Sequence, residues 1–236
     1  MKFDFSEIQY KGRSIRKIIN LPNYHPPQLA EVAGIMLGDG NLYLSKRLKF
    51  HTVVCFNKEE ISYLGHVKTL FEECFYPYRF RVQELEHEFF IMNVSKCVGK
   101  ILTLIGLKEG NKVKNNVKIP EWIFSNKNFL RSVLRGLFDT DGCVYRKYGN
   151  YAQISFKFAG NALIDSTRKA LLELNFNPTN IQIGHSSKGG IDWKFYLSRQ
   201  EEIKKFFLEI KPANEKHMRR LNNIKYGDGG TFISTA

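Results

Sequence analysis

The sequence lacks the features of disulfide-stabilised, zinc-binding and membrane-spanning proteins. It has four cysteines among 236 residues, with no Cys-x-x-Cys spacing and no paired histidines that would complete a zinc site. No run approaches the roughly 18 consecutive apolar residues of a membrane span, and Met1-Lys2-Phe3-Asp4 does not begin like a signal peptide. We therefore expect an intracellular protein, cytoplasmic or organellar, with free thiols and no membrane partner.

Acidic residues are also scarce relative to basic ones. The chain has 23 Asp and Glu against 36 Lys and Arg, a formal net charge of +13, with a sequence pI of about 9.5. A basic domain of this kind indicates a polyanionic partner, most often nucleic acid. An anionic membrane surface is the competing partner, but the sequence contains no strongly amphipathic basic helix to bind one.

One short segment occurs twice. The first copy is Ala33–Gly40, AGIMLGDG, and the second is Leu134–Gly142, LRGLFDTDG. The same offset of 102 residues separates Gly34 from Gly136 and Asp39 from Asp141. The repetition raises the question of whether the two copies come together in the fold.

The pattern of apolar residues repeats with the same offset. In the first half, helical spacing and period-2 alternation predict a helix, two strands, a helix, two strands and a helix over 28–37, 41–45, 49–56, 59–75, 78–85, 89–94 and the segment that Ser95 caps. In the second half we expect the same order over 120–141, strands that include 151–158, then 162–174, 180–184, 191–197 and the last long helix, capped by Ser198.

This order predicts an α+β fold of two pseudo-symmetric αββαββα half-domains, with antiparallel strands joined as hairpins. We expect half-domains over 28–110 and 120–225, joined by a linker over 111–119. A basic lead-in over 1–27 precedes them, and a flexible tail over 226–236 follows.

The two aspartates have both an ordinary and a chemical interpretation. Gly-Asp-Gly after a helix is a common turn sequence. However, Gly34 and Gly38 share one helix face and permit close approach of a partner backbone. Asp39 and Asp141 would also lie at helix C-termini, where the macrodipole disfavours an anion. If the helices pack side by side, the carboxylates repel each other, and a bridging divalent cation would relieve the repulsion.

A magnesium ion is the cation that best fits these ligands. Two carboxylates leave an octahedral Mg²⁺ shell incomplete, so water and substrate phosphates must supply the rest, with the carbonyl oxygens of Gly38 and Thr140 as further candidates. An acidic metal pair on a basic protein indicates phosphodiester hydrolysis by metal-activated water.

The two segments resemble the paired motifs of the LAGLIDADG homing endonucleases in their single-chain, two-motif form. The copy that ends at Asp141 matches more fully, whereas Leu37 replaces the family's first aspartate, at a position that does not bind metal. The resemblance covers roughly residues 28–222. It implies a monomer whose sheets form a saddle in the DNA major groove and whose Asp39 and Asp141 bind Mg²⁺, with Mn²⁺ or Ca²⁺ able to substitute in binding. It also implies cleavage of both strands of a long asymmetric target, leaving 3′ overhangs.

Strand phasing predicts which side chains face DNA. Arg and Gln on such strands can read base edges, while Lys mostly contacts phosphate. A solvated face is the alternative at each position, and a register slip of one residue would exchange the faces. The predicted DNA-facing residues are Asn41, Tyr43, Ser45, Lys46, Arg47, Arg79, Arg81 and Gln83 in the first half, and Tyr145, Lys147, Gln153, Lys157, Gln182 and Lys194 in the second.

Several polar residues are candidates for assisting the aspartates. Asn57-Lys58 lies where members of the resembled family often carry a Gln-Lys pair, and the Asn departs from that pattern. Lysines at the matching ends of the two halves could stabilise charge on the reacting phosphate or contact DNA phosphates. These lysines are Lys112 or Lys114, and Lys211 or Lys216.

The leading hypothesis is a site-specific, Mg²⁺-dependent double-strand DNA endonuclease. The alternative is a non-cleaving nucleic-acid binder of the same fold, either an intron RNA maturase with host intron RNA as partner or a transcription factor. Retention of both aspartates favours the nuclease, because a pure binder could lose them and relieve their repulsion. An intron-encoded or free-standing reading frame is expected rather than an intein, since Met1 and Ala236 are not splicing residues.

Overall fold

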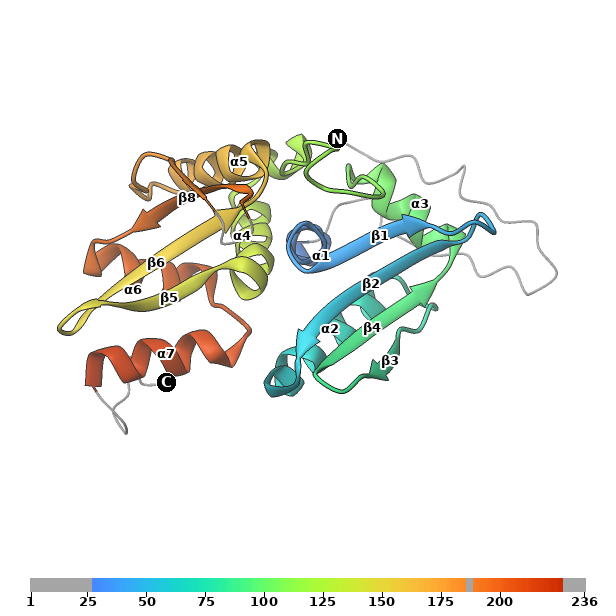
Figure 1. Cartoon of the computed structure of the whole chain (residues 1–236), viewed down its shortest axis with the longest axis horizontal. Helices are drawn as coiled ribbons and strands as arrows, with labels where there is room; N and C mark the ends of the chain where they lie inside the picture. The colour runs from blue at the N-terminus through green and yellow to red at the C-terminus, as the bar shows by residue number, and fades with distance from the viewer. Residues whose placement is uncertain (1–26, 186–188, 227–236) are drawn as a thin grey trace.

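The computed structural model describes residues 27–185 and 189–226, which form two halves that share the order helix, two strands, helix, two strands, helix (Figure 1). The first half contains α1 (Pro27–Leu37), β1 (Gly40–Leu44), β2 (Phe50–Asn57), the 3₁₀ turn η1 (Lys58–Glu60), α2 (Ile61–Cys74), β3 (Arg81–Glu84), β4 (Glu88–Val94) and α3 (Lys96–Leu104). The second contains η2 (Glu121–Ser125), α4 (Lys127–Asp141), β5 (Cys143–Tyr148), β6 (Tyr151–Phe158), α5 (Asn161–Glu173), β7 (Gln182–His185), β8 (Ile191–Leu197), α6 (Gln200–Ile210) and α7 (Glu215–Tyr226).

Each half is built on a four-stranded antiparallel sheet, which confirms the predicted α+β fold class. The strand order is β1-β2-β4-β3 in one sheet and β5-β6-β8-β7 in the other. Helices lie behind one face of each sheet, with α2 behind β2 and β4 and α6 behind β5 and β6 (Figure 1). The predicted lead-in, apart from Pro27, and the predicted tail, apart from Tyr226, lie outside the described residues.

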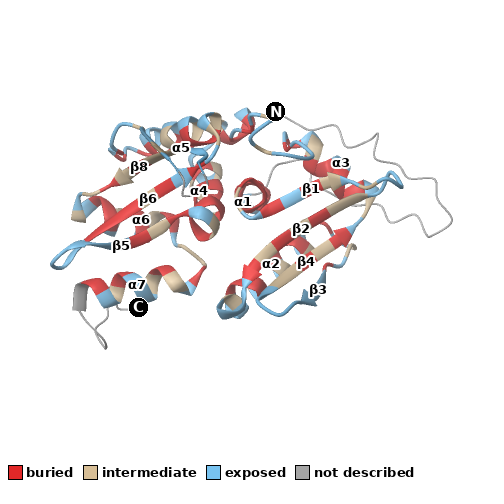
Figure 2. Ribbon diagram, viewed as in Figure 1, coloured by how far each residue is buried: buried red, intermediate tan, exposed pale blue. Residues whose placement is uncertain are grey.

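Side chains on the helix-facing side of the strands form the core of each half. Val54 and Ile91 are fully buried in the first half, as are Ile154, Phe156 and Phe195 in the second. Buried and more accessible positions alternate along most of β2 (Figure 2), as expected when one sheet face is packed and the other is open. None of the helices in the described ranges is long and apolar enough to cross a membrane.

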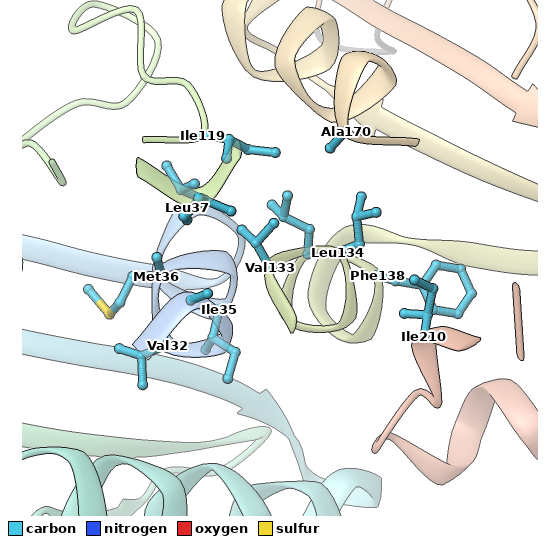
Figure 3. Packing of buried hydrophobic residues seen from close by; sticks show 14 of the residues in the cluster. Val32, Ile35, Met36, Leu37, Ile119, Val133, Leu134, Phe138, Ala170 and Ile210 are labelled. Atoms are coloured by element: carbon cyan, nitrogen blue, oxygen red, sulfur yellow. The ribbon is translucent and has the colours of Figure 1, made fainter. Parts of the chain in front are cut away.

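The helices α1 and α4 lie side by side between the two halves. Every residue of α1 from Leu29 to Leu37 is buried, so this helix is surrounded by protein rather than amphipathic. Figure 3 shows Leu37 of α1 next to Val133 of α4. The two repeated segments therefore meet, and they join the half-domains.

Glycine permits this close contact. A Cβ atom at Gly34 would collide with the carbonyl oxygen of Val133, and one at Gly136 would lie 2.5 Å from the carbonyl oxygen of Glu31. The backbones approach too closely for any larger residue at either position. The sequence prediction of close helix approach at the repeated glycines is confirmed.

Three predicted element boundaries were wrong. Pro120 precedes η2 rather than α4, and the N-cap of α4 is Asn126, whose side chain accepts a hydrogen bond from the Asn128 amide at 2.8 Å. The strand expected over 78–85 is confined to β3. Ser95 caps α3 as predicted, accepting from the Val98 amide at 3.4 Å, but Ser198 does not cap α6.

Ser198 and α7 account for the remaining differences. The hydroxyl of Ser198 lies 2.5 Å from the amide nitrogen of Gln153, and Arg199 occupies the N-cap of α6 without a capping side-chain bond. Helix α7 was not predicted. Lys211 ends α6 in the left-handed conformation, with φ of 53°, and Asn214 then accepts from the Lys216 amide at 3.2 Å to start a new helix.

Candidate active site

The two repeated aspartates lie at the adjacent C-terminal ends of α1 and α4. Asp141 is the last residue of α4, and Asp39 follows α1 after Gly38. A Cβ atom at Gly38 would collide with the Thr140 hydroxyl and lie 2.7 Å from Oδ2 of Asp141. Both aspartates are exposed to solvent. The fold therefore brings the two carboxylates together at an accessible point between the halves.

The surroundings disfavour negative charge on both carboxylates. Desolvation raises the pKa of Asp141 to about 7, with a further contribution from the charge of Asp39. Desolvation also raises the pKa of Asp39, and the nearby Glu60 carboxylate adds to this effect. The like-charge repulsion predicted from the sequence is therefore present, and two lysines, Lys112 and Lys216, counteract it.

The lysines act across the boundary between the halves. Lys216, at the start of α7 in the second half, is the cation that most lowers the pKa of Asp39 in the first. Lys112, in the linker that follows the first half, is the cation that most lowers the pKa of Asp141. Its ammonium group also donates a hydrogen bond to the carbonyl oxygen of Gly38. Of the four candidate lysines, these two are the ones that act on the aspartates.

Lys114 and Lys211, the other two candidates, are not among the charges that shift the pKa of Asp39 or Asp141. Lys114 is exposed, and its amide rather than its ammonium group makes the hydrogen bond, to Oδ1 of Asn111 at 2.9 Å. Lys211 occupies the end of α6. The sequence could not choose between the paired lysines because turn geometry decides which one points toward the carboxylates.

Lys58, which the sequence analysis named as a candidate for assisting the aspartates, makes its ion pair elsewhere. Its ammonium group pairs with Oε1 of Glu84 on β3 at 2.9 Å, and both side chains are largely exposed. Asn57 ends β2, and its backbone amide donates to Oε2 of Glu60 at 2.9 Å. The residue of this junction that does approach the site is Glu60, which the sequence analysis missed. A signal was present, because Asn followed three residues later by Glu is a capping-box pattern.

The donor set fits a hard divalent cation. In the described part of the chain neither aspartate carboxylate accepts a hydrogen bond, so their oxygens are available. No cluster of three or more His, Cys, Asp or Glu side chains suited to a metal occurs among those residues. The two carboxylates would therefore be the protein's anionic ligands. The Gly38 carbonyl is engaged by Lys112, and the Thr140 hydroxyl binds the carbonyl of Gly136 at 2.9 Å within α4.

The open face of the first sheet carries half of the side chains predicted there, namely Asn41, Tyr43, Arg81 and Gln83. The register pairs Asn41 with Val53 and Tyr43 with His51, and the Tyr43 and His51 rings stack at 4.8 Å. Arg81 and Gln83 on β3 share this face, opposite Met92 and Phe90 of β4. Leu42, at an alternate position on β1, is buried on the other face. The predicted phase of β1 and β3 is correct.

Three predicted DNA-facing residues lie in the β1–β2 turn, and another lies outside the strands. Ser45, Lys46 and Arg47 form the turn, where the Ser45 hydroxyl accepts from the Lys49 amide at 3.2 Å. Arg79 precedes β3, and its guanidinium pairs with Oε2 of Glu72 on α2 at 2.9 Å. The prediction that Arg79 is a strand residue is wrong, because β3 begins only at Arg81.

The strand phasing also predicted the open face of the second sheet correctly. One side chain on that face, Gln153, is hydrogen-bonded to other side chains of the protein. Lys157 pairs with Lys194, and Lys194 with Gln182 on β7. Tyr145 lies opposite Gln153, and its hydroxyl donates to Oε1 of Gln153 at 2.6 Å. Gln153 also reaches Ser198 and is 6% exposed, so its amide is not free to read a base in this structure.

Two lysines of this sheet differ in their surroundings. Lys157 is held by Asp192 at 2.8 Å. Lys147 lies at a register shift between Arg146 and Tyr148. A bulge there interrupts the alternation of faces from which Lys147 was assigned to the open face. Tyr145, Gln182 and Lys194 thus remain on the open face with Lys157, and Lys147 lies exposed at the irregular end of β5.

Residues 128–211 match the family model of a LAGLIDADG-like domain. No curated protein matches the sequence. Among solved structures, mesophilic variants of the homing endonuclease I-DmoI match with a TM-score of 0.58 and 17% identity, over 78% of this chain and 94% of theirs. I-DmoI in complex with DNA and Ca matches with a TM-score of 0.53 and 17% identity, over 75% and 86%.

A further structural match lies outside I-DmoI. The N-terminal LAGLIDADG domain of DUF199/WhiA aligns with a TM-score of 0.51 and 16% identity, over 81% of this chain and 86% of that domain. At these identities the likeness concerns the fold, and it spans both halves of the chain. Residues 128–211 thus resemble a LAGLIDADG-like domain, and the chain as a whole has the two-domain LAGLIDADG fold.

Proposed function

We propose that this chain is a site-specific double-strand DNA endonuclease that acts as a monomer and requires a divalent cation, Mg²⁺ in the first place. The observation that carries the proposal is the meeting of Asp39 and Asp141 at the ends of α1 and α4, one carboxylate from each half. Similarity to I-DmoI, whose structures include complexes with target DNA, supports DNA as the substrate. The net charge of +13 suits it as well.

The open sheet faces would contact the DNA. Arg81 and Gln83 in the first half and Gln182 in the second carry donors that can read base edges in the major groove. Lys157 and Lys194 are suited to phosphate contacts that fix register. Because the two sheets carry different side chains, an asymmetric target is expected.

The chemistry would take place at the aspartate pair. A bound divalent cation would supply activation of water and stabilisation of the leaving oxygen, and Asp39 and Asp141 would hold it. Lys112 and Lys216 would place positive charge beside the reacting phosphates, where charge develops in the transition state. Both strands would then be cut, leaving 3′ overhangs, from a site assembled by one chain.

A cleavage selection on a randomised DNA library, with Mg²⁺ present, would identify the target and test the proposal. On the selected DNA, Asp39→Asn and Asp141→Asn should each lower double-strand cleavage by roughly 100-fold or more, with binding in Ca²⁺ retained. The matched control is Asp165→Asn, an exposed aspartate on α5. Full double-strand cleavage by either active-site variant would refute the shared site.

A non-cleaving nucleic-acid binder or an intron RNA maturase is the second candidate. The structural match to the LAGLIDADG domain of DUF199/WhiA favours keeping it, since that fold is not confined to proteins described as endonucleases. Splicing assays with a host intron, run beside the cleavage assays, would separate the two. Splicing that survives in Asp39→Asn, with no cleavage by the wild type, would favour the maturase.

A further inference from the structure

The two lysines beside the aspartates are held in different ways. Lys216 forms an ion pair with Glu60, with 2.7 Å between Nζ and Oε1, and the side chains are only 19% and 9% exposed. Lys112 has no such carboxylate partner among the described residues and instead donates to the Gly38 carbonyl. The first lysine is fixed by a hydrogen-bonded carboxylate, whereas within the described part of the chain the second donates to a backbone oxygen instead.

Glu60 is itself fixed on both carboxylate oxygens. Its Oε2 accepts from the Asn57 amide at 2.9 Å, which anchors it to the end of β2. Its Oε1 accepts from Lys216 and from the Asn214 side chain at 2.8 Å. Glu60 belongs to the first half, while Asn214 and Lys216 belong to the second, so these hydrogen bonds cross the boundary between the halves.

Glu60 lines a small polar cavity at the boundary between the halves. A cavity of about 130 Å³ lies between η1 and the start of α7, lined in part by Asn57, Glu60, Asn214 and Lys216. Ser62 at the start of α2 donates to Oε1 of Glu215 across the same boundary at 2.8 Å. Helix α7 therefore contacts the first half at Ser62 as well as at Glu60, and an exposed ion pair joins Arg219 to Glu59 at 3.9 Å. Of these contacts, the one with Glu60 holds Lys216.

The second half has no counterpart of this arrangement. Between β6 and α5 the chain has only Ala159 and Gly160, where the first half has the charged turn η1. No carboxylate is therefore available at the matching junction to hold Lys112. The pseudo-symmetry of the fold therefore does not extend to the side chains that hold the two lysines.

We propose that Glu60 is a positioning residue that fixes Lys216 beside Asp39, and that it makes the two halves of the active site unequal, so that the two DNA strands depend on it differently. The proposal rests on the endonuclease function proposed above. Glu60 touches no reacting atom in it. Its role is to hold the ammonium group of Lys216 in one place, so loss of Glu60 should slow the strand whose cleavage depends on Lys216 and spare the other.

The test follows each strand separately. The selected DNA duplex is labelled differently on its two strands, and single-turnover rates are measured in Mg²⁺ for wild type, Glu60→Ala, Glu60→Gln and Lys216→Met. We expect Glu60→Ala to slow one strand by about 10-fold or more and to leave the other within about 2-fold. Lys216→Met should slow the same strand. Glu60→Gln, which keeps an acceptor for Lys216, should restore part of the rate.

A matched control separates positioning from general weakening of the boundary. Ser62→Ala removes the separate hydrogen bond from Ser62 of α2 to Glu215 of α7 but leaves Lys216 untouched, and it should leave the ratio of the two strand rates unchanged. Equal slowing of both strands in Glu60→Ala, or no slowing, would overturn the proposal. If Glu60→Ala does not fold, as judged by circular dichroism, the strand ratio in Glu60→Gln decides instead. If the wild type cleaves neither strand of any selected DNA, the proposed endonuclease function fails.

Discussion

The two halves share one framework but differ at the junction between the second strand and the following helix. In the first half this junction is η1, which brings Glu60 to the boundary between the halves. In the second half it is shortened to Ala159 and Gly160. The helices and sheets that form the two cores are repeated, whereas the loops beside the aspartates are not. Packing constrains the first set in both halves, and the loops are free to differ.

The ends of the halves differ as well. After α3 the chain continues through a connection without regular structure, which carries Lys112 to Gly38. After α6 it forms α7, which lies along β5 (Figure 1) and carries Lys216. Each half thus places one lysine near the aspartates, the first from an irregular connection and the second from a helix. Similar charge beside the two aspartates therefore does not require similar structure.

The largest expected effect tests whether the halves contribute equally to the helix contact. Gly34→Ala and Gly136→Ala each place a Cβ atom against backbone of the other helix, and each should lower the free energy of unfolding by about 1–3 kcal/mol. Gly65→Ala, in α2 with nothing within 4 Å of the added atom, is the matched control and should stabilise by up to about 1 kcal/mol. Urea denaturation measures the free energy of unfolding of all three variants. If either Gly34→Ala or Gly136→Ala leaves it unchanged, the two halves do not contribute equally to the helix contact.

An intermediate effect concerns the aspartates and pH in metal-free buffer. The pKa of Asp141 is raised to about 7 in the folded protein, so the folded state binds more protons than the unfolded state between about pH 4 and 7. Its contribution to stability is therefore most favourable at low pH and is lost as the pH rises through 7. Asp141→Asn should be more stable than wild type at pH 8 by about 1 kcal/mol, a figure discounted for solvent screening of an exposed group.

The comparison with pH 5 checks the sign of that prediction. The advantage of Asp141→Asn should shrink there, because Asp141 is largely protonated in the folded wild type. Asp139, with a pKa also raised to about 7 by burial, titrates in both proteins and cancels in the difference. Thermal unfolding of both proteins at the two pH values measures the difference in stability between Asp141→Asn and wild type. An advantage that grows toward low pH would contradict the assigned cause.

The smallest expected effect sharpens the contrast between Lys58 and Lys216. Lys58 pairs with Glu84 at the exposed edge of the first sheet, and such pairs contribute about 0.2–1 kcal/mol. Lys58→Met should therefore change stability by less than about 1 kcal/mol and cleavage by less than about 2-fold, unlike Lys216→Met. Both variants remove one ammonium group, which makes them a matched pair in the strand-labelled cleavage assay. A large loss of cleavage in Lys58→Met would support the role that the sequence predicted for Lys58, assistance of the two aspartates.

The sequence by itself determined the duplicated framework and the aspartate pair. Periodicity along the chain is set by burial, so alternation identified β6, and helical spacing identified α1. Repetition of a small-residue helix that ends in Asp then indicated that Asp39 and Asp141 would meet. The open-face positions of Arg81 and Lys194 followed from the same alternation, since side chains on a strand change face at every residue.

The tertiary structure alone decided which polar side chains surround that pair. Lys58 and Glu60 are two residues apart, yet Lys58 turns toward β3 and Glu60 toward α7. Gln153 has the correct phase but is engaged by Tyr145 and Ser198. Contacts across the boundary depend on turn conformations and on partners more than 150 residues away in sequence, such as Lys216 for Glu60. No local pattern encodes these contacts, because each side chain's orientation is fixed only when both halves are packed together.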